Sequence, residues 1–152
     1  MSGKPCVILM AEDDADDQVL ARDAFAEAGV HGDLRFVSNG EELTDYLWHC
    51  GKFADLDSFP TPALILLDLN MPRKDGRQAL CEIKADPELR RIPVVVLTTS
   101  KADTEIAKIY DLGANSFITK PVQFAALVKT MKLIGQYWLQ AVELPVPKGN
   151  SL

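Results

Sequence analysis

The chain has 152 residues, of which 47% are hydrophobic and 25% charged, and its formal net charge at pH 7 is −6. This length and balance are those of one ordinary globular domain, and the acidic charge argues against nucleic acid as the main partner. No run reaches the roughly 18 apolar residues that span a bilayer, and the N-terminus lacks the apolar core of a signal peptide. We therefore expect a cytoplasmic protein with no membrane contact.

Short apolar runs alternate with amphipathic stretches along the chain, which predicts strands in alternation with helices. Strands are predicted at residues 6–11, 34–37, 63–67, 93–97 and 116–119. Helices are predicted at 15–28, after the cap Asn39, at 77–86, at 102–112, and from 122 or 123 up to the prolines at 145 and 147. The inner face of the last helix is expected to carry Phe124, Leu127, Val128, Met131, Ile134 and Trp138. Residues 50–62 are expected to form a loop.

This order amounts to five βα units in succession, which predicts one α/β domain. Residues 63–67 are apolar at every position, as is typical of a central parallel strand that is covered on both faces. We expect a (βα)5 doubly wound sheet of five parallel strands, with a core over about residues 5–142 and a loose tail at 143–152. In such sheets the ligand site lies beyond the carboxyl ends of the strands.

Polar side chains follow four of the five predicted strands, and we expect them to converge. They are Glu12 and Asp13 after the first strand, Asp68 after the third, Thr98 at the fourth and Lys120 at the fifth. Three crowded carboxylates require a cation, and an all-oxygen set without His or Cys favours Mg²⁺, or Mn²⁺ in its place, over Zn²⁺. A lysine and a hydroxyl suit phosphate oxygens, so the set fits phosphoryl transfer.

Each of these residues also has a structural interpretation when it is taken alone. Acids after the first strand favour the positive N-terminus of the following helix, which is sufficient for Asp14, Asp16 and Asp17. Thr98 is a β-former, and Lys120 is compatible with a solvated strand end. Only the combination, with each group at the same end of a different strand, favours a reactive site.

Four motifs resemble those of bacterial two-component response-regulator receiver domains, which have a flavodoxin-like fold. They are Glu12-Asp13, the run from Leu66 to Pro72 with Asp75-Gly76, Leu97-Thr98-Thr99, and the run from Phe117 to Pro121. The resemblance covers about residues 5–142. It implies that Asp68 accepts a phosphoryl group from a sensor histidine kinase. It also implies that Mg²⁺ is held by the side chains of Asp13 and Asp68, by the Asn70 backbone carbonyl, and by Glu12 through water.

The same resemblance implies how the signal is read out. Thr98 bonds the phosphoryl oxygen, Lys120 pairs with it, and the Lys120-Pro121 peptide bond is cis. Phe117 occupies the position of the switch aromatic, so the surface of the fourth helix, fifth strand and fifth helix changes shape after phosphorylation. A plain core role for Phe117 is compatible with this function.

The loop at 50–62, the run Leu97-Thr98-Thr99-Ser100 and the C-terminal extension resemble the single-domain regulators of bacterial phytochromes. This resemblance implies a light-signalling phosphorelay and a homodimer. Tyr137, Trp138 and Leu139 are consecutive, and one helical stripe cannot bury all three, so they are the expected dimer or partner surface. The alternative is that this segment folds back onto its own domain.

Two rival functions remain. The first is a Mg²⁺-dependent phosphohydrolase with an aspartate nucleophile, but such enzymes place a second Asp two residues on, where this chain has Asn70, which cannot transfer a proton. The second is a phosphate sink or binding module that serves a different kinase. We expect a phosphoacceptor that catalyses its own phosphotransfer and dephosphorylation, and not an enzyme that turns over a separate substrate.

Overall fold

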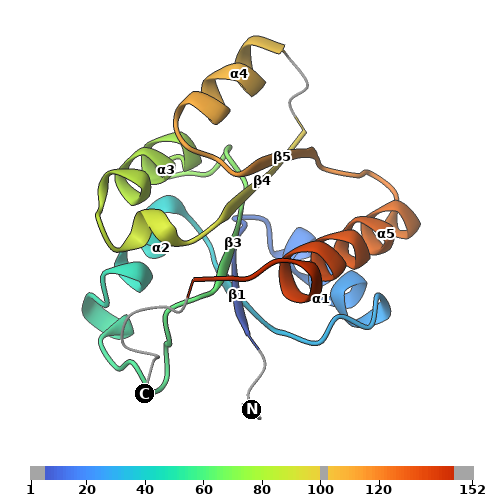
Figure 1. The fold of residues 1–152 in the computed structure, drawn as a ribbon, viewed down its shortest axis with the longest axis horizontal. Coiled ribbons are helices and arrows are strands. Elements are labelled where there is room, and N and C mark those ends of the chain that lie inside the picture. Colours follow the sequence, from blue (N-terminus) through green and yellow to red (C-terminus); the bar gives the residue numbers. More distant parts are fainter. Residues whose placement is uncertain (1–5, 100–102, 146–152) are drawn as a thin grey trace.

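A computed structural model describes residues 6–99 and 103–145, and its centre is one parallel five-stranded sheet (Figure 1). The strand order is β2-β1-β3-β4-β5. The strands are β1 Val7–Ala11, β2 Asp33–Val37, β3 Leu64–Leu67, β4 Val94–Thr98 and β5 Ser116–Thr119. The predicted α/β class, the five strands and their parallel pairing are thereby confirmed.

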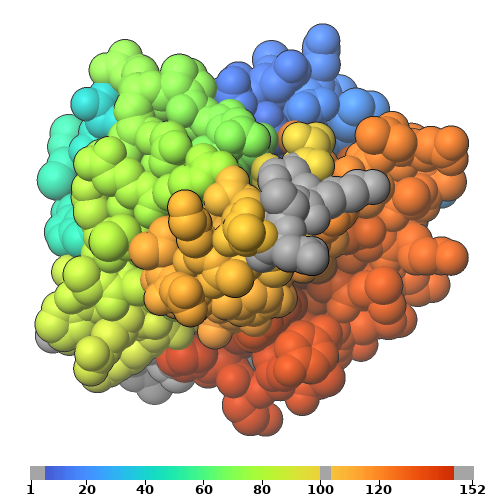
Figure 2. Space-filling model, turned by 90° about the horizontal axis from the view of Figure 1, so that it is seen from above, coloured from blue at the N-terminus to red at the C-terminus, as the bar shows by residue number. Residues whose placement is uncertain are grey.

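Helices cover both faces of the sheet, as short βα connections require. They are α1 Ala15–Glu27, α2 Gly40–Leu47, α3 Gly76–Ala85, α4 Asp103–Asp111 and α5 Phe124–Ile134. α1 and α5 lie together on one face, and α2 and α3 lie on the other (Figure 1). In the view of Figure 2, α4 lies between α3, in green, and the segment that leads into α5, in orange. The predicted start of α4 at Ala102 lies outside the described residues.

The core has two halves because successive side chains of a strand point to opposite faces of the sheet. Leu64 and Leu66 of β3 belong to the cluster under α1 and α5, whereas Ile65 and Leu67 belong to the cluster under α2 and α3. All four side chains are at most 1% exposed. The continuous apolar run therefore reflects a strand that is buried on both faces, as predicted.

The segment 50–62 is more ordered than the loop that the sequence predicts. It contains a 3-10 helix, Gly51–Phe53, and the rings of Tyr46, Phe53 and Phe59 pack edge to face or tilted. The Tyr46 hydroxyl donates a hydrogen bond to the carbonyl oxygen of Pro60 at 2.8 Å. Aromatic packing organises this segment, and a search for helical or strand periodicity cannot detect such packing.

The last helix also differs from the prediction. α5 ends at Ile134, and the chain continues as a π-helix, Gly135–Ala141. The expected inner residue Phe124 is 42% exposed, so its assignment to the buried stripe is wrong. Met131 and Ile134 are buried as expected, and Leu127 and Val128 are partly buried against the same core. The wider π-helix changes the angular spacing of the residues that follow Ile134.

Candidate functional site

Strand register brings the predicted polar residues to one edge of the sheet. Ala11 is opposite Leu67, so Glu12 and Asp68, the next residue of each chain segment, become neighbours. The Asp68 N–H donates to the Ala11 carbonyl at 3.1 Å, which continues the ladder by one step. On the other side, the Lys120 N–H donates to the Thr98 carbonyl at 2.8 Å.

Glu12, Asp13 and Asp68 form a compact acidic cluster. Each offers one carboxylate oxygen, and these oxygens all lie within 4.8 Å of one another. Glu12 is 1% and Asp68 8% exposed, while Asp13 faces solvent. Burial raises the pKa of Glu12, although hydrogen bonds from Lys120 and from the Asp14 backbone lower it. Hard oxygen donors with one side open to water are a donor set that suits Mg²⁺ or Mn²⁺.

Lys120 supplies the positive charge at this cluster. Its Nζ lies 2.5 Å from Glu12 Oε1, 3.1 Å from Asp17 Oδ2 and 3.5 Å from Asp68 Oδ2. Burial opposes the charged form, but the hydrogen bonds and charges of Glu12, Asp17 and Asp68 outweigh it and raise the pKa of Lys120. Lys120 therefore carries a full charge at neutral pH and balances part of the acidic cluster.

The contact with Asp17 is one that sequence reasoning missed, because the helix N-terminus is by itself a sufficient explanation for an acid at this position. A usable signal was its position in the first turn of α1, which begins directly after the site acids. A side chain on that turn can still reach the strand ends. Its 3.1 Å separation from Lys120 Nζ is shorter than that of Asp68.

The turn between β3 and α3 shapes the surroundings of Asp68. The Asn70 N–H donates to Asp68 Oδ1 at 3.1 Å, and the Asn70 side-chain amide lies 3.5 Å from Thr98 Oγ1. A Cβ on Gly76 would lie 2.5 Å from the Asp68 carbonyl oxygen and 2.7 Å from Leu69 Cα. Glycine is therefore required for α3 to begin so close to the end of β3.

The predicted switch residues occupy neighbouring strands. Thr98 is fully buried at the end of β4, and Phe117 of β5 is partly buried against the core cluster under α2 and α3. The Phe117 N–H donates to the Tyr110 hydroxyl of α4 at 3.1 Å. A shift of the Phe117 backbone would therefore change this contact with α4.

An open groove of about 460 Å³ runs beside the acidic cluster between α1 and the start of α5. Asp17 and Lys120 lie at its polar end, and its apolar part includes Leu20, Pro121 and Phe124. Leu20 is 45% and Phe124 42% exposed, and Val122 beside them is almost fully exposed. The groove thus joins a charged centre to an apolar surface.

The structure contradicts the expected cis bond before Pro121 and agrees only in part with the expected surface at residues 137–139. The Lys120-Pro121 bond is trans, so the expected cis bond is wrong; trans is the more stable form even before proline. Trp138 and Leu139 pack against the core cluster under α1 and α5, whereas Tyr137 is 55% exposed. Of the three predicted surface residues, only Tyr137 presents most of its side chain to solvent, and the other two fold back onto the domain.

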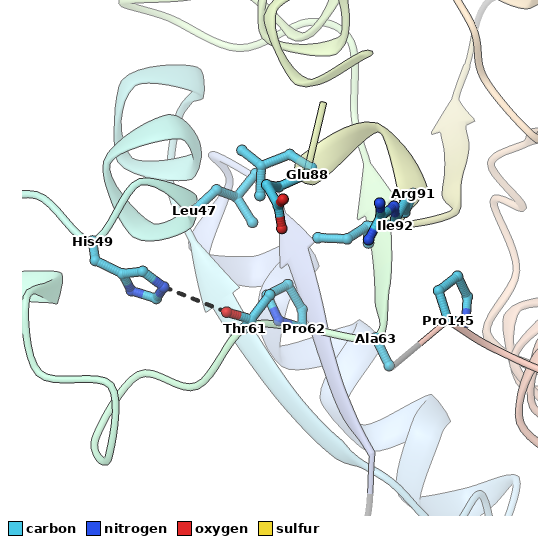
Figure 3. Close-up of a pocket in the computed structure, with 10 residues that line it drawn as sticks. Leu47, His49, Thr61, Pro62, Ala63, Glu88, Arg91, Ile92 and Pro145 are labelled. Atoms are coloured by element: carbon cyan, nitrogen blue, oxygen red, sulfur yellow. Dashed lines mark hydrogen bonds between the residues drawn. The ribbon is translucent and has the colours of Figure 1, made fainter. Parts of the chain in front are cut away.

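A second cavity lies at the opposite end of the sheet, near the start of β3 (Figure 3). It measures about 190 Å³ and is lined by residues that include Leu47, His49, Thr61, Ile92 and Pro145. His49 Nε2 lies 3.4 Å from Thr61 Oγ1, as the dashed line in Figure 3 marks. None of the predicted site residues lines this cavity.

No helix within residues 6–99 and 103–145 is both long and apolar enough to cross a membrane.

Comparison with known proteins gives a consistent result along almost the whole chain. Residues 8–132 match the model of the response regulator receiver domain. The chain is 39% identical over 144 residues to response regulator Rcp1 of Synechocystis, covering 95% of this chain and 96% of Rcp1. It is 38% identical over 144 residues to the probable methanogenesis regulatory protein FilR2 of Methanothrix harundinacea, covering 94% of this chain and 90% of FilR2.

Solved structures agree with these sequence relatives. The phosphorylated cyanobacterial phytochrome response regulator RcpA superposes with a TM-score of 0.85 at 42% identity, covering 93% of this chain and 99% of RcpA. The Mn²⁺-bound form of Rcp1 superposes with a TM-score of 0.83 at 39% identity, covering 93% and 99% of the two chains. The chain belongs to the response regulator receiver domain family, with a flavodoxin-like receiver fold, and is a response regulator related to those of cyanobacterial phytochromes.

Proposed function

We propose that this regulator accepts a phosphoryl group on Asp68 from a phosphohistidine of a sensor kinase. An Asp68 carboxylate oxygen bonds to phosphorus, the P–N bond breaks, and the imidazole leaves. The observation that carries the proposal is the placement of Asp68. The residue is 8% exposed and directly follows a fully apolar strand, and its carboxylate lies 3.5 Å from the Lys120 ammonium.

The acidic cluster supports a Mg²⁺ requirement. The side chains of Asp13 and Asp68 and the Asn70 carbonyl would hold the ion, with Glu12 acting through water. When bound, the ion supplies positive charge to the phosphoryl oxygens. Lys120 adds a second positive charge, and the Thr98 hydroxyl can donate to a phosphoryl oxygen. The related regulator Rcp1 has been solved in a Mn²⁺-bound form, which supports the use of a divalent ion here.

The kinase docks in the groove beside Lys120. A phosphohistidine must approach Asp68 from the open side of the site, and the groove begins there. Its apolar part, with Leu20 and Phe124 exposed, suits an amphipathic helix of the partner that buries a few apolar side chains. We propose a phytochrome-type histidine kinase as that partner, since the similar regulator RcpA is a phytochrome response regulator.

The output surface is formed by α4, β5 and α5. A phosphoryl group on Asp68 draws the Thr98 hydroxyl toward it, and Phe117 turns into the space that is released. Where the Phe117 backbone shifts with its ring, the hydrogen bond from its N–H to the Tyr110 hydroxyl carries the change to α4. The regulator acts as a homodimer that uses Tyr137, and the exposed Leu133 four residues earlier extends the same apolar surface.

Phosphoryl uptake tests the acceptor directly. Wild-type protein with Mg²⁺ and acetyl phosphate is expected to gain one phosphoryl group by intact mass spectrometry, and Asp68→Asn none. Asp75→Asn, at the cap of α3, is a matched control that should keep uptake. Loss of uptake in both variants, or in neither, would contradict the assignment of Asp68. Rapid turnover of phosphomonoesters would instead indicate the hydrolase.

Two further measurements address the partners. Phosphotransfer from a panel of purified histidine kinases that includes phytochromes should be fastest with a phytochrome; preference for an unrelated kinase would contradict the pathway.

Light scattering of wild type, Tyr137→Ser and Trp138→Ala tests the dimer. Tyr137→Ser should give monomers because Tyr137 is the exposed member, and a monomeric wild type would overturn the dimer.

A further inference from the structure

Asp17 contacts the site lysine without belonging to the acidic cluster. It lies in the first turn of α1, where its N–H donates to the cap residue Asp14 at 3.1 Å. Its carboxylate oxygen Oδ2 lies 3.1 Å from Lys120 Nζ, which is closer than the 3.5 Å that separates Lys120 from Asp68. The lysine therefore lies closer to this residue of α1 than to Asp68.

The three carboxylates around Lys120 differ in the free-energy cost of losing their contact with its ammonium. A lysine ammonium has three hydrogens to donate, and the contacts with Glu12, Asp17 and Asp68 match that number. A phosphoryl group on Asp68 would add negative charge and new acceptor oxygens, so the lysine must weaken another contact. Glu12 is 1% exposed and would become an unpaired buried charge, whereas the Asp17 side chain is 39% exposed and can be rehydrated.

We propose that Asp17 is a positioning residue that competes with Asp68 for the Lys120 ammonium and releases it when Asp68 is phosphorylated. This inference rests on the proposed function of Asp68. Asp17 does not touch the reacting oxygen, so its effect passes through Lys120. Asp17 sets the free-energy cost of moving the Lys120 ammonium to the phosphoryl oxygens, and thereby the rate of phosphoryl uptake.

The variant Asp17→Asn keeps the side-chain shape and removes the charge that competes for Lys120. Uptake from acetyl phosphate at saturating Mg²⁺ should become about two- to fivefold faster, the effect expected from loss of one partly exposed ion pair. Asp17→Glu restores the carboxylate and should return the rate toward that of wild type. A Glu variant that behaves like the Asn variant would overturn the proposal, because charge would then not be the cause.

Asp16→Asn is the matched control. Asp16 lies in the same first turn of α1, so its removal changes net charge and the interaction with the helix N-terminus by the same amount. Only Asp17 of the pair contacts Lys120. The uptake rate of Asp16→Asn should stay near that of wild type. Equal rates in the two Asn variants, or slower uptake in Asp17→Asn, would overturn the proposal.

The ammonium resonance of Lys120 gives a readout that does not need phosphorylation. In ¹⁵N NMR of unphosphorylated protein, Asp17→Asn should shift the Lys120 Nζ signal and speed its hydrogen exchange, whereas Asp16→Asn should leave both unchanged. An unchanged Lys120 signal in Asp17→Asn refutes the contact itself. Wild type that takes up no phosphoryl group refutes the proposed function and this inference together, whereas normal uptake with equal Asn variants refutes this inference alone.

Discussion

Lys120 and Lys84 are two partly buried lysines at opposite ends of the sheet, and their surroundings differ in kind. Lys120 lies at the carboxyl ends of the strands among three carboxylates. Lys84, on α3, lies near the amino ends of β4 and β5. Its Nζ donates to the carbonyls of Arg90 at 3.0 Å and Ile92 at 2.9 Å, and to Asn115 Oδ1 at 3.3 Å.

The two environments move the lysine pKa in opposite directions. Burial lowers the pKa of Lys84, whose ammonium donates to neutral oxygens. Burial has the same tendency at Lys120, but Glu12, Asp17 and Asp68 reverse it and raise the pKa. The ammonium of Lys84 donates to neutral oxygens, whereas the three carboxylates around Lys120 stabilise its charged form. The partners of a buried lysine, and not its burial, therefore distinguish the two roles.

Lys120→Met should have the largest effect. It leaves the buried Glu12 carboxylate unpaired, so the free energy of unfolding without Mg²⁺ should fall by about 3 kcal/mol, and phosphoryl uptake should fall by about 100-fold. Urea unfolding and the acetyl phosphate assay measure the two effects. The double variant Glu12→Gln, Lys120→Met should recover much of the stability but none of the uptake. Unchanged stability in the single variant would contradict the pairing.

Lys84→Met should lower the stability of the fold without slowing phosphoryl uptake. It removes three hydrogen bonds from the ammonium and leaves the Arg90 and Ile92 carbonyls without this donor, so the free energy of unfolding should fall by about 2 kcal/mol. Phosphoryl uptake should stay within about twofold of wild type, because Lys84 lies at the far end of the sheet. A large loss of uptake in a folded Lys84→Met protein would show that the two ends are coupled and would break the comparison.

Alkaline titration should give opposite signs for the two lysines. The folded pKa of Lys120 lies above the ordinary 10.5, so its stabilisation is complete below 10.5 and is lost as pH rises through the folded value. The folded pKa of Lys84 lies below 10.5, so the unfolded chain holds the proton longer and stability rises with pH between the folded value and 10.5. Urea unfolding of wild type against each Met variant, from about pH 8 upward, measures the difference. Slopes of the same sign would contradict the assigned environments.

Asn115→Asp should have the smallest effect on stability. It tests whether the lowered pKa of Lys84 depends on the absence of a carboxylate beside it. It places a carboxylate beside Lys84 while an oxygen can still accept the Val94 N–H, which Asn115 Oδ1 accepts at 2.9 Å. Because Asn115 is exposed, the added stability should be only about 0.5 kcal/mol. The alkaline slope assigned to Lys84 should nevertheless become shallower. A slope that stays as in wild type would show that burial alone sets this pKa.

Gly113, near Lys84 at the amino end of β5, shows what can and cannot be predicted from sequence patterns in this part of the molecule. It directly follows the fourth predicted helix, residues 102–112, and its φ of +109° suits a glycine that ends a helix. The sequence does not show that a Cβ there would lie 2.8 Å from Lys84 Cγ. The helix stop is a local property of the chain, whereas the passage of Lys84 beside it depends on how α3 and the turn before β5 meet.

The candidate site also has features that could be predicted from the sequence and features that could not. The placement of Glu12, Asp13, Asp68, Thr98 and Lys120 could be predicted because parallel strands present all their carboxyl ends at one edge. The preference of Lys120 for Glu12 and Asp17 over Asp68 could not, since it depends on distance differences of 0.4 to 1.0 Å between side chains from separate elements. The trans Lys120-Pro121 bond and the exposure of Phe124 were likewise missed.

The sequence by itself determined the five βα units, the buried central strand and the residue types at the strand ends. These follow from the periodicity of apolar residues and from local caps such as Asn39, which need only neighbouring residues. Only the tertiary structure decided which carboxylate holds Lys120, how Trp138 and Leu139 fold back through a π-helix, and how aromatic rings order residues 50–62. Those outcomes are competitions between groups that are distant in the chain, and only packing brings such groups close enough to compete.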